Sequence, residues 1–263
     1  MQYNYSPAEV RRARLRSQSL VPEAAAQRVE QVTENVCGLQ AQQPLSAALG
    51  VRARSSGLTL TAVERARIEE RTVLRTWCVR GTMHLVSTND VPWMLSAFGP
   101  VFSARSRSRL DDLGFNAATC EEAIEVIKNA IHEYGHLTRF EIVDVLQNAD
   151  LEFDPDGQAP HHLIRQGALR GVFCEVSPKD GREAYGLLEE WVGIDDFPDR
   201  GPSLEILDRR YLSAYQPATI DDFASWSKLP MIDVRWLGGN RRRNDGRQRE
   251  SKTVTRLRRG LPQ

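Results

Sequence analysis

The sequence predicts a mainly helical fold that carries small β-hairpins, and three observations support this prediction. Apolar residues recur every three or four positions through most of the chain, as on one face of a helix. Two groups of such helices are each followed by two short strands, within residues 72–86 and 171–188. An internal repeat is also indicated, because Tyr134, Thr138, Glu141 and Ile142 are matched 81 residues later by Tyr215, Thr219, Asp222 and Phe223. Helices followed by a hairpin have the order of a winged helix, so we expect tandem winged-helix (helix-turn-helix) domains.

Composition favours a globular, cytoplasmic protein. Of the 263 residues, 41% are apolar and 27% are charged, and no uninterrupted run of 18 apolar residues is present to span a membrane. The N-terminus has neither the charged start nor the apolar core of a signal peptide. The four cysteines contain no C-x-x-C pair, so neither a disulfide framework nor a zinc finger is predicted. We expect reduced thiols and no membrane contact.

Charge is segregated along the chain, although the formal net charge is zero. Residues 1–110 hold 15 basic and 8 acidic side chains, residues 111–239 hold 11 and 25, and residues 240–263 hold 9 and 2. Every basic side chain before Lys128 is arginine, whose planar fork suits phosphate contact. A coding bias toward arginine explains the same excess, so charge alone does not decide between these interpretations.

The first domain is expected over residues 1–113 and begins with four helices. Helix starts are predicted at Ser6-Pro7-Ala8-Glu9, at Val21-Pro22-Glu23, at Pro44 and at Thr61. The second of these helices has apolar positions up to Leu39 and should end near Gln40. A last helix is expected to begin at Asn89-Asp90-Val91-Pro92 and to end at Gly114, where the composition changes.

A β-hairpin between Thr72 and Val86 is expected to form the wing of this domain. With Arg80-Gly81 as a two-residue turn, Trp77 would lie opposite His84. One face would then join the core and carry Leu74, Cys78, Met83 and Leu85. The other face would be free to touch a ligand and would carry Arg75, Trp77, Thr82 and His84. The alternative is a wing that only packs on its own domain.

Further domains are expected after the change in composition. The second, residues 114–200, should contain helices over 119–131, 138–146 and 160–169 and strands over 171–176 and 183–188. An incomplete third copy is expected over residues 201–230, because the apolar periodicity stops after Pro230. Residues 231–263 are predicted to be a basic, disordered tail, the product of a truncation or a shifted reading frame; a basic DNA-binding arm is the alternative.

The segment His132-Glu133-Tyr134-Gly135-His136 matches the H-E-x-x-H pattern of zinc proteases. Zinc binding by this pattern needs both histidines on one helical face. Gly135 is a typical helix end, and the repeat aligns Pro217 with His136, so the helix should stop between the two histidines. We therefore predict no metal here, and none at His161-His162.

Three stretches resemble the AlkZ-like winged-helix DNA glycosylase family. The glutamine-pair motif of that family is matched by Gly38-Leu39-Gln40-Ala41-Gln42, and its R-x-W-x-x-R-G-T-[LM]-H-x-V pattern by residues 75–86. Residues 211–219 also fit. The resemblance implies a bacterial DNA glycosylase, without a cofactor, that hydrolyses the N-glycosidic bond of alkylated purines in double-stranded DNA. It also implies substrates of the N7-alkylguanine type and, as in some members, the unhooking of interstrand crosslinks.

By this resemblance, Gln40 and Gln42 are the catalytic pair. Contacts to DNA would come from Arg52, Arg54, Arg75, Trp77, Arg80, Thr82 and His84, with the arginines on phosphates. We expect a monomer that associates with the nucleoid through DNA.

An amide pair can serve this chemistry because an alkylated purine carries positive charge and is already a good leaving group. The enzyme then needs to hold water near C1′ of the sugar, and an amide oxygen can orient that water. Gln40 and Gln42 point to one side in an extended segment but diverge by about 200° in a helix. A helix break at this stretch is therefore part of the prediction, as is a cleft shared with Trp77 and His84.

Two other hypotheses stay open from the residues alone. A non-catalytic winged-helix DNA binder or regulator would place helix 160–169 in the major groove. That helix lies in the acidic middle of the chain, which phosphates would repel. The third hypothesis is an inactive, truncated relative.

Overall fold

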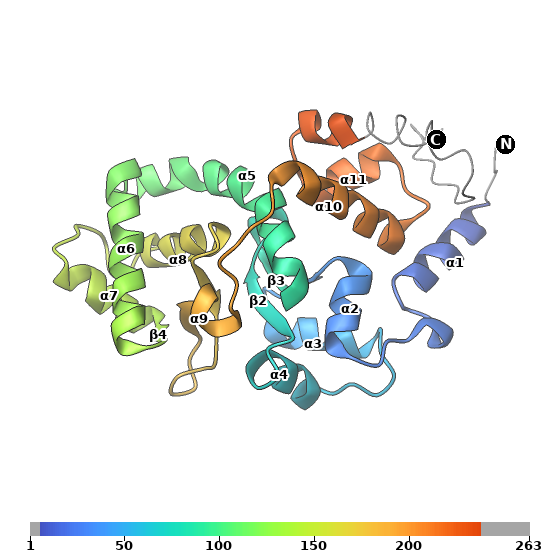
Figure 1. Ribbon diagram of the computed structural model, residues 1–263, viewed down its shortest axis with the longest axis horizontal. Helices are drawn as coiled ribbons and strands as arrows, with labels where there is room; N and C mark the ends of the chain where they lie inside the picture. The colour runs from blue at the N-terminus through green and yellow to red at the C-terminus, as the bar shows by residue number, and fades with distance from the viewer. Residues whose placement is uncertain (1–5, 238–263) are drawn as a thin grey trace.

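The computed structural model describes residues 6–237 and shows a mainly helical protein built around one small antiparallel sheet (Figure 1). The six strands have the order β1-β3-β2-β5-β6-β4. In Figure 1, α6 and α7 lie at one end of the molecule, and α1, α10 and α11 lie toward the other. The predicted mainly helical fold with small hairpins is confirmed.

The first part of the chain contains α1 (Pro7–Ser17), η1 (Pro22–Ala24), α2 (Val29–Val36), β1 (Leu39–Gln40), α3 (Pro44–Arg52), α4 (Leu60–Ile68), β2 (Val73–Trp77), η2 (Val79–Gly81), β3 (Met83–Ser87), η3 (Thr88–Asp90) and α5 (Val91–Asp112). The predicted start of α1 is confirmed, because Ser6 and Glu9 form a capping box. α4 starts earlier than predicted. Its cap is Thr59 rather than Thr61, and the Thr59 hydroxyl accepts from the Ala62 N–H at 3.2 Å.

The second helix also starts elsewhere than predicted. It begins at Val29, and Val21-Pro22-Glu23 leads only into the short η1 turn. Backbone pairing explains the delay. The Ala26 N–H donates to the Arg54 carbonyl at 2.9 Å, and the Ala26 carbonyl accepts from the Ser56 N–H at 3.0 Å. These bonds commit Ala26 to a bridge, so it cannot belong to the first helical turn.

The next part of the chain contains α6 (Ala117–Tyr134), β4 (Leu137–Thr138), α7 (Arg139–Asn148), α8 (Ala159–Leu169), β5 (Phe173–Glu175), β6 (Ala184–Leu187) and α9 (Leu188–Val192). The three helices and two strands predicted between residues 114 and 200 are confirmed, and β4 and α9 were not foreseen. α6 begins two residues earlier than predicted. The Asn116 side chain accepts from the N–H groups of Ala118 and Thr119 at 2.9 and 3.1 Å and caps the helix there.

The order of the elements repeats along the chain. The set α2, β1, α3, α4, β2 and β3 is followed in the same order by α6, β4, α7, α8, β5 and β6. In each set the first strand pairs with the last, and the last pairs with the middle one. The two sets join where Arg75 of β2 pairs with Glu175 of β5, so one sheet runs through both. The domain limits at residues 113 and 200 stay a prediction.

A third occurrence of the repeat begins with α10 (Arg200–Tyr215) and α11 (Ile220–Ser227). Thr138 begins α7 with a capping box that Glu141 closes. Thr219 begins α11 with a capping box that Asp222 closes. The internal repeat read from the sequence is therefore confirmed in three dimensions.

The helical pattern continues past Pro230, contrary to the prediction that it stops there. Residues 231–237 are helical, and Val234 and Leu237 are buried in the main core. The Arg200 guanidinium pairs with both carboxylate oxygens of Asp233, at 2.9 and 2.7 Å, and fastens this segment to α10. The remainder of the predicted tail, residues 238–263, lies outside the described residues.

The long helix α5 joins the parts of the molecule by packing against both α8 and α10. Gly99 marks the crossing with α8, because a Cβ at this position would lie 2.2 Å from the Leu169 carbonyl oxygen. The main core runs through both repeats, and a smaller core lies under β1, β3 and the helices α2 to α4. Within residues 6–237, no helix has the length and apolar character to cross a membrane.

Candidate active site

The Gln40–Gln42 segment is extended, as the predicted helix break requires. α2 ends before Cys37, and Cys37 and Gly38 adopt positive φ values of 59° and 87°. Glycine takes this conformation without strain, so Gly38 suits the turn. The chain then enters β1, in which Gln40 lies opposite His84 of β3. The prediction of a helix break is confirmed.

Both glutamine side chains are exposed, while Ala41 between them is fully buried. Gln40 is the last residue of β1, and Gln42 follows at a bend just before α3. Gln40 Oε1 lies 3.5 Å from an Arg80 Nη2, and Gln42 Oε1 lies 3.4 Å from the Met83 backbone nitrogen. Both distances are long for hydrogen bonds. Within residues 6–237 the amide NH2 groups donate to no acceptor, so they are open to a ligand.

The hairpin between β2 and β3 has a longer turn than the predicted Arg80-Gly81 turn. Its tip is η2, where the Gly81 N–H donates to the Cys78 carbonyl at 2.9 Å and both Arg80 and Gly81 have positive φ. Packing explains this shape. A Cβ on Gly81 would lie 3.0 Å from Phe102 of α5, and the Gly81 carbonyl accepts from Arg165 of α8 at 3.0 Å. The predicted two-residue turn is wrong because the tip folds against α5 and α8.

The longer turn shifts the hairpin register by one residue. Trp77 lies opposite Met83, and His84 lies opposite Thr76. Neighbouring residues of a strand face opposite sides, so Trp77 and His84 lie on opposite faces of the sheet. The prediction that they share a face is wrong. Of the two, His84 is the one across from Gln40, so the predicted common cleft with Trp77 is not formed.

The hairpin side chains predicted to face a ligand are mostly buried. The exposed fraction is 5% for Arg75 and 3% for both Trp77 and His84. Trp77 packs against Tyr185 and His161 of the second repeat, with ring centroids 6.1 and 5.7 Å apart. Burial lowers the pKa of His84 to about 4, which leaves a neutral ring. The expectation that this face is free to touch a ligand is wrong, because both faces of the sheet are covered.

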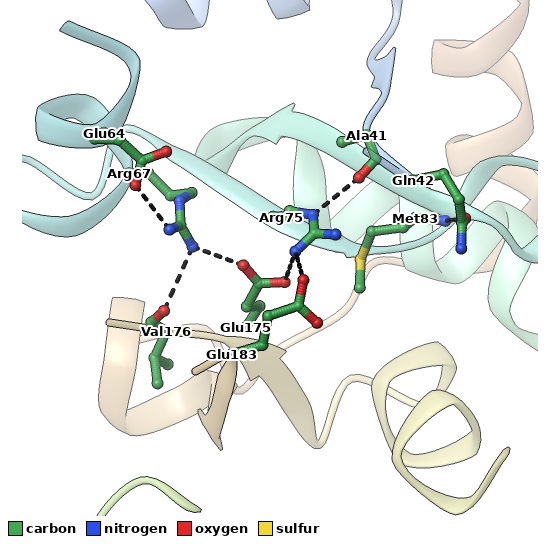
Figure 2. A network of polar contacts seen from close by, with 9 residues as sticks. All are labelled: Ala41, Gln42, Glu64, Arg67, Arg75, Met83, Glu175, Val176 and Glu183. Atoms are coloured by element: carbon green, nitrogen blue, oxygen red, sulfur yellow. Dashed lines mark hydrogen bonds and ion pairs between the residues drawn. The ribbon is translucent and has the colours of Figure 1, made fainter. Parts of the chain in front are cut away.

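Arg75 connects the glutamine pair to the second repeat (Figure 2). Its Nε donates to the carbonyl of Ala41, the residue between the two glutamines, at 2.9 Å. Its Nη1 donates to Glu175 and, at 2.7 Å, to Glu183. The sequence predicts a phosphate contact for Arg75, but the structure commits all of these donors to the protein. Arg75 holds the backbone of the glutamine segment instead.

Glu175 lies at the centre of the same network (Figure 2). Arg67 of α4 donates to Glu175 at 2.9 Å and also pairs with Glu64 at 2.8 Å. Burial raises the pKa of Glu175 to about 7, and Arg75 and Arg67 oppose that rise. Sequence reasoning assigned no role to Arg67 or Glu175. No local pattern could have found them, because the pairing of β2 with β5 brings them together.

Four predicted DNA contacts reach the surface. Arg52, at the end of α3, is exposed and forms no ion pair within residues 6–237, and Arg80 and Thr82 are half-buried. Arg80 Nη1 donates to the carbonyl of Trp226 at 3.1 Å. Arg54 is half-buried, and its Nε has no hydrogen-bond partner within the described part of the chain. Of these basic groups, Arg80 is the one that lies beside the glutamine pair, 3.5 Å from Gln40 Oε1.

The third repeat contributes to the site, which the sequence reasoning missed. The Tyr215 hydroxyl donates to the Val36 carbonyl at 2.9 Å, just before the turn that leads into β1. Trp226 of α11 receives the hydrogen bond from Arg80 described above. Residues 211–219 fit the family pattern, and that fit was the signal available for Tyr215.

The H-E-x-x-H segment is not arranged as a zinc-binding helix. α6 ends at Tyr134, and Gly135 has a φ of 79°, so the predicted helix stop between His132 and His136 is confirmed. His132 Nδ1 instead lies 2.7 Å from a carboxylate oxygen of Glu190. No cluster of three metal-ligating side chains occurs anywhere in the part of the chain that the structure describes.

Comparison with known proteins gives one consistent result. The family model described as DNA glycosylase AlkZ-like matches residues 33–247. An interstrand DNA cross-link repair glycosylase from Streptomyces sahachiroi is 27% identical over 221 residues, which are 79% of this chain and 58% of that protein. The solved structure of the Streptomyces sahachiroi DNA glycosylase AlkZ has the same fold, with a TM-score of 0.77 and 23% identity over 90% of this chain and 66% of the other. The chain thus spans little more than half the length of its curated relative.

Proposed function

Because this chain belongs to the AlkZ-like DNA glycosylase family, we propose that it hydrolyses the N-glycosidic bond of N7-alkylguanine-type purines in double-stranded DNA. The proposal includes the unhooking of crosslinks formed through such purines, and it assigns catalysis to Gln40 and Gln42. We further propose that the two complete repeats are winged helices and that α10 begins a third.

The geometry of the glutamine pair is the observation that supports this proposal best. Two exposed amides lie two residues apart where β1 ends, and their NH2 groups are open to a ligand. A buried arginine, Arg75, donates to the Ala41 carbonyl and so fixes the backbone from which both amides project.

The reaction follows from the leaving group. N7 alkylation makes the purine cationic, so the bond between C1′ and N9 can break with its electron pair moving to N9. Water then adds to C1′ and loses a proton to solvent. An amide oxygen of Gln40 or Gln42 would orient that water, and the NH2 groups would hold a sugar or phosphate oxygen. Arg52 and Arg80 would contact phosphates, which position DNA without reading its sequence.

The non-catalytic alternative loses support from the packing of α8. Eight of the 11 residues of this helix are buried, so it cannot enter a major groove without leaving the core. A groove-binding regulator of the kind considered above would need another element for DNA recognition.

The test is release of 7-methylguanine from an N7-methylguanine-containing duplex, measured for the wild type and for Gln40→Ala and Gln42→Ala. We expect each variant to lose at least about 100-fold in rate, the loss typical of removing a preorganised polar group. Gln43→Ala is the matched control, because Gln43 is an exposed neighbour without a side-chain capping bond. Salt-sensitive DNA binding without release by the wild type would favour the non-catalytic alternative, and release that survives both substitutions would contradict the assignment.

A further inference from the structure

Three arginines from distant parts of the chain meet at the tip of the hairpin between β2 and β3, and we name them the arginine cluster. Arg80 belongs to η2, Arg105 to α5 and Arg165 to α8, and these two helices lie next to each other (Figure 1). Arg165 Nε donates to the Gly81 carbonyl at 3.0 Å, so it contacts the residue that follows Arg80. Arg105 Cζ lies 5.0 Å from the ring centroid of Phe102, and a Cβ on Gly81 would lie 3.0 Å from the Phe102 Cβ.

Each member of the arginine cluster is held by a backbone carbonyl rather than by a carboxylate. Arg80 Nη1 donates to Trp226 at 3.1 Å, and Arg105 Nη1 donates to Lys228 at 2.7 Å. Arg165 is held by the hairpin tip, as described above. None of the three forms an ion pair within the described part of the chain. A guanidinium carries several N–H donors, so Arg105 and Arg165 keep donors that a ligand can use.

The positive charge of the arginine cluster is not neutralised by neighbouring side chains. Arg105 is exposed, and Arg80 and Arg165 are half-buried. Burial lowers the pKa of the Arg165 guanidinium, and no carboxylate of the described residues raises it again. A partly desolvated cation of this kind is stabilised by an anionic ligand.

The fold places this basic surface where the charge of the sequence did not predict it. Arg165 lies in the acidic middle of the chain, residues 111–239. The contact with the hairpin tip brings it beside Arg80 and Arg105, which belong to the basic first part of the chain. Repulsion of phosphates by the acidic middle therefore does not apply to this surface.

Arg80 connects the arginine cluster to the glutamine pair. Its Nη2 lies 3.5 Å from Gln40 Oε1. Its φ is 59°, a left-handed conformation that costs free energy for a residue with a Cβ and that glycine or asparagine adopts more readily. The turn by itself would therefore favour a smaller residue, and the arginine side chain is what this position adds.

We propose that the arginine cluster binds a phosphodiester group of the damaged DNA strand, next to the nucleotide that Gln40 and Gln42 act on. This inference rests on the proposed glycosylase function. Guanidinium groups suit this ligand because their planar forks match phosphate oxygens. Phosphate contacts fix the position of a duplex without reading its sequence. α8 can remain in the core, since only the Arg165 side chain at its edge contacts DNA.

The salt dependence of DNA binding tests this proposal, because each neutralised phosphate releases counterions. Arg105→Gln and Arg165→Gln remove the charge but keep an NH2 donor for the carbonyls. Binding of each full-length protein to an undamaged duplex is followed by fluorescence anisotropy from about 50 to about 200 mM KCl, and thermal melting checks folding. We expect the slope of log K against log[KCl] to fall in magnitude by about 0.9 in each variant and by about 1.8 in the double variant.

Arg107→Gln is the matched control, because it removes the same charge from the same helix. Arg107 lies about 200° around the helix axis from Arg105, and it pairs with Asp111 at 3.2 Å. The slope should be unchanged in Arg107→Gln, and Arg105→Lys, which keeps the charge, should also keep the slope.

A second measurement locates the contact on the damaged strand. Neutral methylphosphonates replace, one at a time, the phosphates that flank an N7-methylguanine. Binding is compared in the Gln40→Ala background, which should not release the base. One replacement should weaken binding when both arginines are present and have no effect in the Arg105→Gln/Arg165→Gln double variant. If no replacement depends on the two arginines, the proposed position beside the lesion is wrong.

Failure of the arginine cluster and failure of the glycosylase function give different results. An unchanged slope in a folded Arg105→Gln or Arg165→Gln, or an equal fall in Arg107→Gln, overturns the cluster and leaves the release assay on the glutamine variants to stand by itself. If Arg165→Gln does not fold, the exposed Arg105 decides alone. A fall in slope in the cluster variants, with no base release by wild type, supports the DNA contact and refutes the proposed activity.

Discussion

Replacement of Arg75 by methionine should remove the polar contacts that connect the second repeat to the glutamine segment. Arg75→Met keeps an unbranched apolar stem but removes the donors to Ala41, Glu175 and Glu183. Arg75 and Glu175 are 5% and 3% exposed, so their pairing belongs to the interior. We expect both the free energy of unfolding and the rate of base release to fall.

The size of the stability loss follows from the remaining partners. Removal of one partner of a buried ion pair costs about 3–5 kcal/mol, and an unmade hydrogen bond to a buried carbonyl costs about 1 kcal/mol more. Glu175 keeps Arg67 at 2.9 Å, and with a pKa of about 7 it can take up a proton near neutral pH. We therefore expect the lower end of the ion-pair range together with the lost hydrogen bond, about 4 kcal/mol in total.

The loss should also grow with pH. Without the Arg75 guanidinium the pKa of Glu175 rises further above 7, so the folded variant retains a proton that the unfolded chain has released. A group with a raised carboxyl pKa in the folded state lowers stability as pH increases toward that pKa. The difference between wild type and Arg75→Met should thus be larger at about pH 8.5 than at about pH 6.5.

Urea unfolding of the full chain measures these differences, and Arg65→Met serves as the control. Arg65 pairs with Glu70 at 2.9 Å, but the two side chains are 58% and 47% exposed. Surface pairs of this kind contribute about 0–1 kcal/mol. If Arg75→Met and Arg65→Met lose the same small amount of stability, the Arg75 network does not join the two repeats.

Three further predictions concern single positions. His84→Gln should reduce the loss of stability on acidification. Burial lowers the pKa of His84 to about 4, so the neutral ring contributes stability that is fully present above the unfolded pKa of 6.5 and is lost as pH falls through 4. The free energy of unfolding lost in this way is about 3 kcal/mol. If the free energy of unfolding falls by the same amount in His84→Gln and in wild type between pH 6.5 and pH 4, this prediction is contradicted. Gly99→Ala should lower the melting temperature strongly, because its Cβ would meet the Leu169 carbonyl oxygen at 2.2 Å. A melting temperature within about 1–2 °C of wild type would show that the crossing of α5 and α8 can relax. Thr219→Ala should cost about 1 kcal/mol in urea unfolding through loss of the cap of α11, whereas Thr219→Ser should keep it.

Much of the fold could be read from local patterns. Ser6 with Glu9, and Thr138 with Glu141, are capping boxes whose partners are three residues apart, so the sequence contains the whole interaction. The helix starts that were predicted at the wrong residue depend on distant partners or on a competing N-cap residue. Ala26 is held by Arg54 and so cannot begin a helix.

In the candidate site, too, local features were predictable and features set by distant contacts were not. The helix break before the glutamine pair was predictable, because Gly38, which tolerates a positive φ, directly follows the left-handed Cys37 that ends α2. The register of the hairpin was not predictable, because the packing of Gly81 against α5 and α8 sets it. A shift of one residue then moved Trp77 to the face opposite His84.

The sequence by itself therefore determined most helix starts and the helix break before the glutamine pair, because each depends on residues a few positions apart, and it showed the repeat because the same local pattern recurs 81 residues later. Tertiary structure alone decided which of those groups reach solvent. The pairing of β2 with β5 buried Arg75 against Glu175, and the hydrogen bond of Arg80 to Trp226 connected α11 to the residue that lies beside Gln40. Burial depends on partners 100 or more residues away, and no local pattern records which of them will meet.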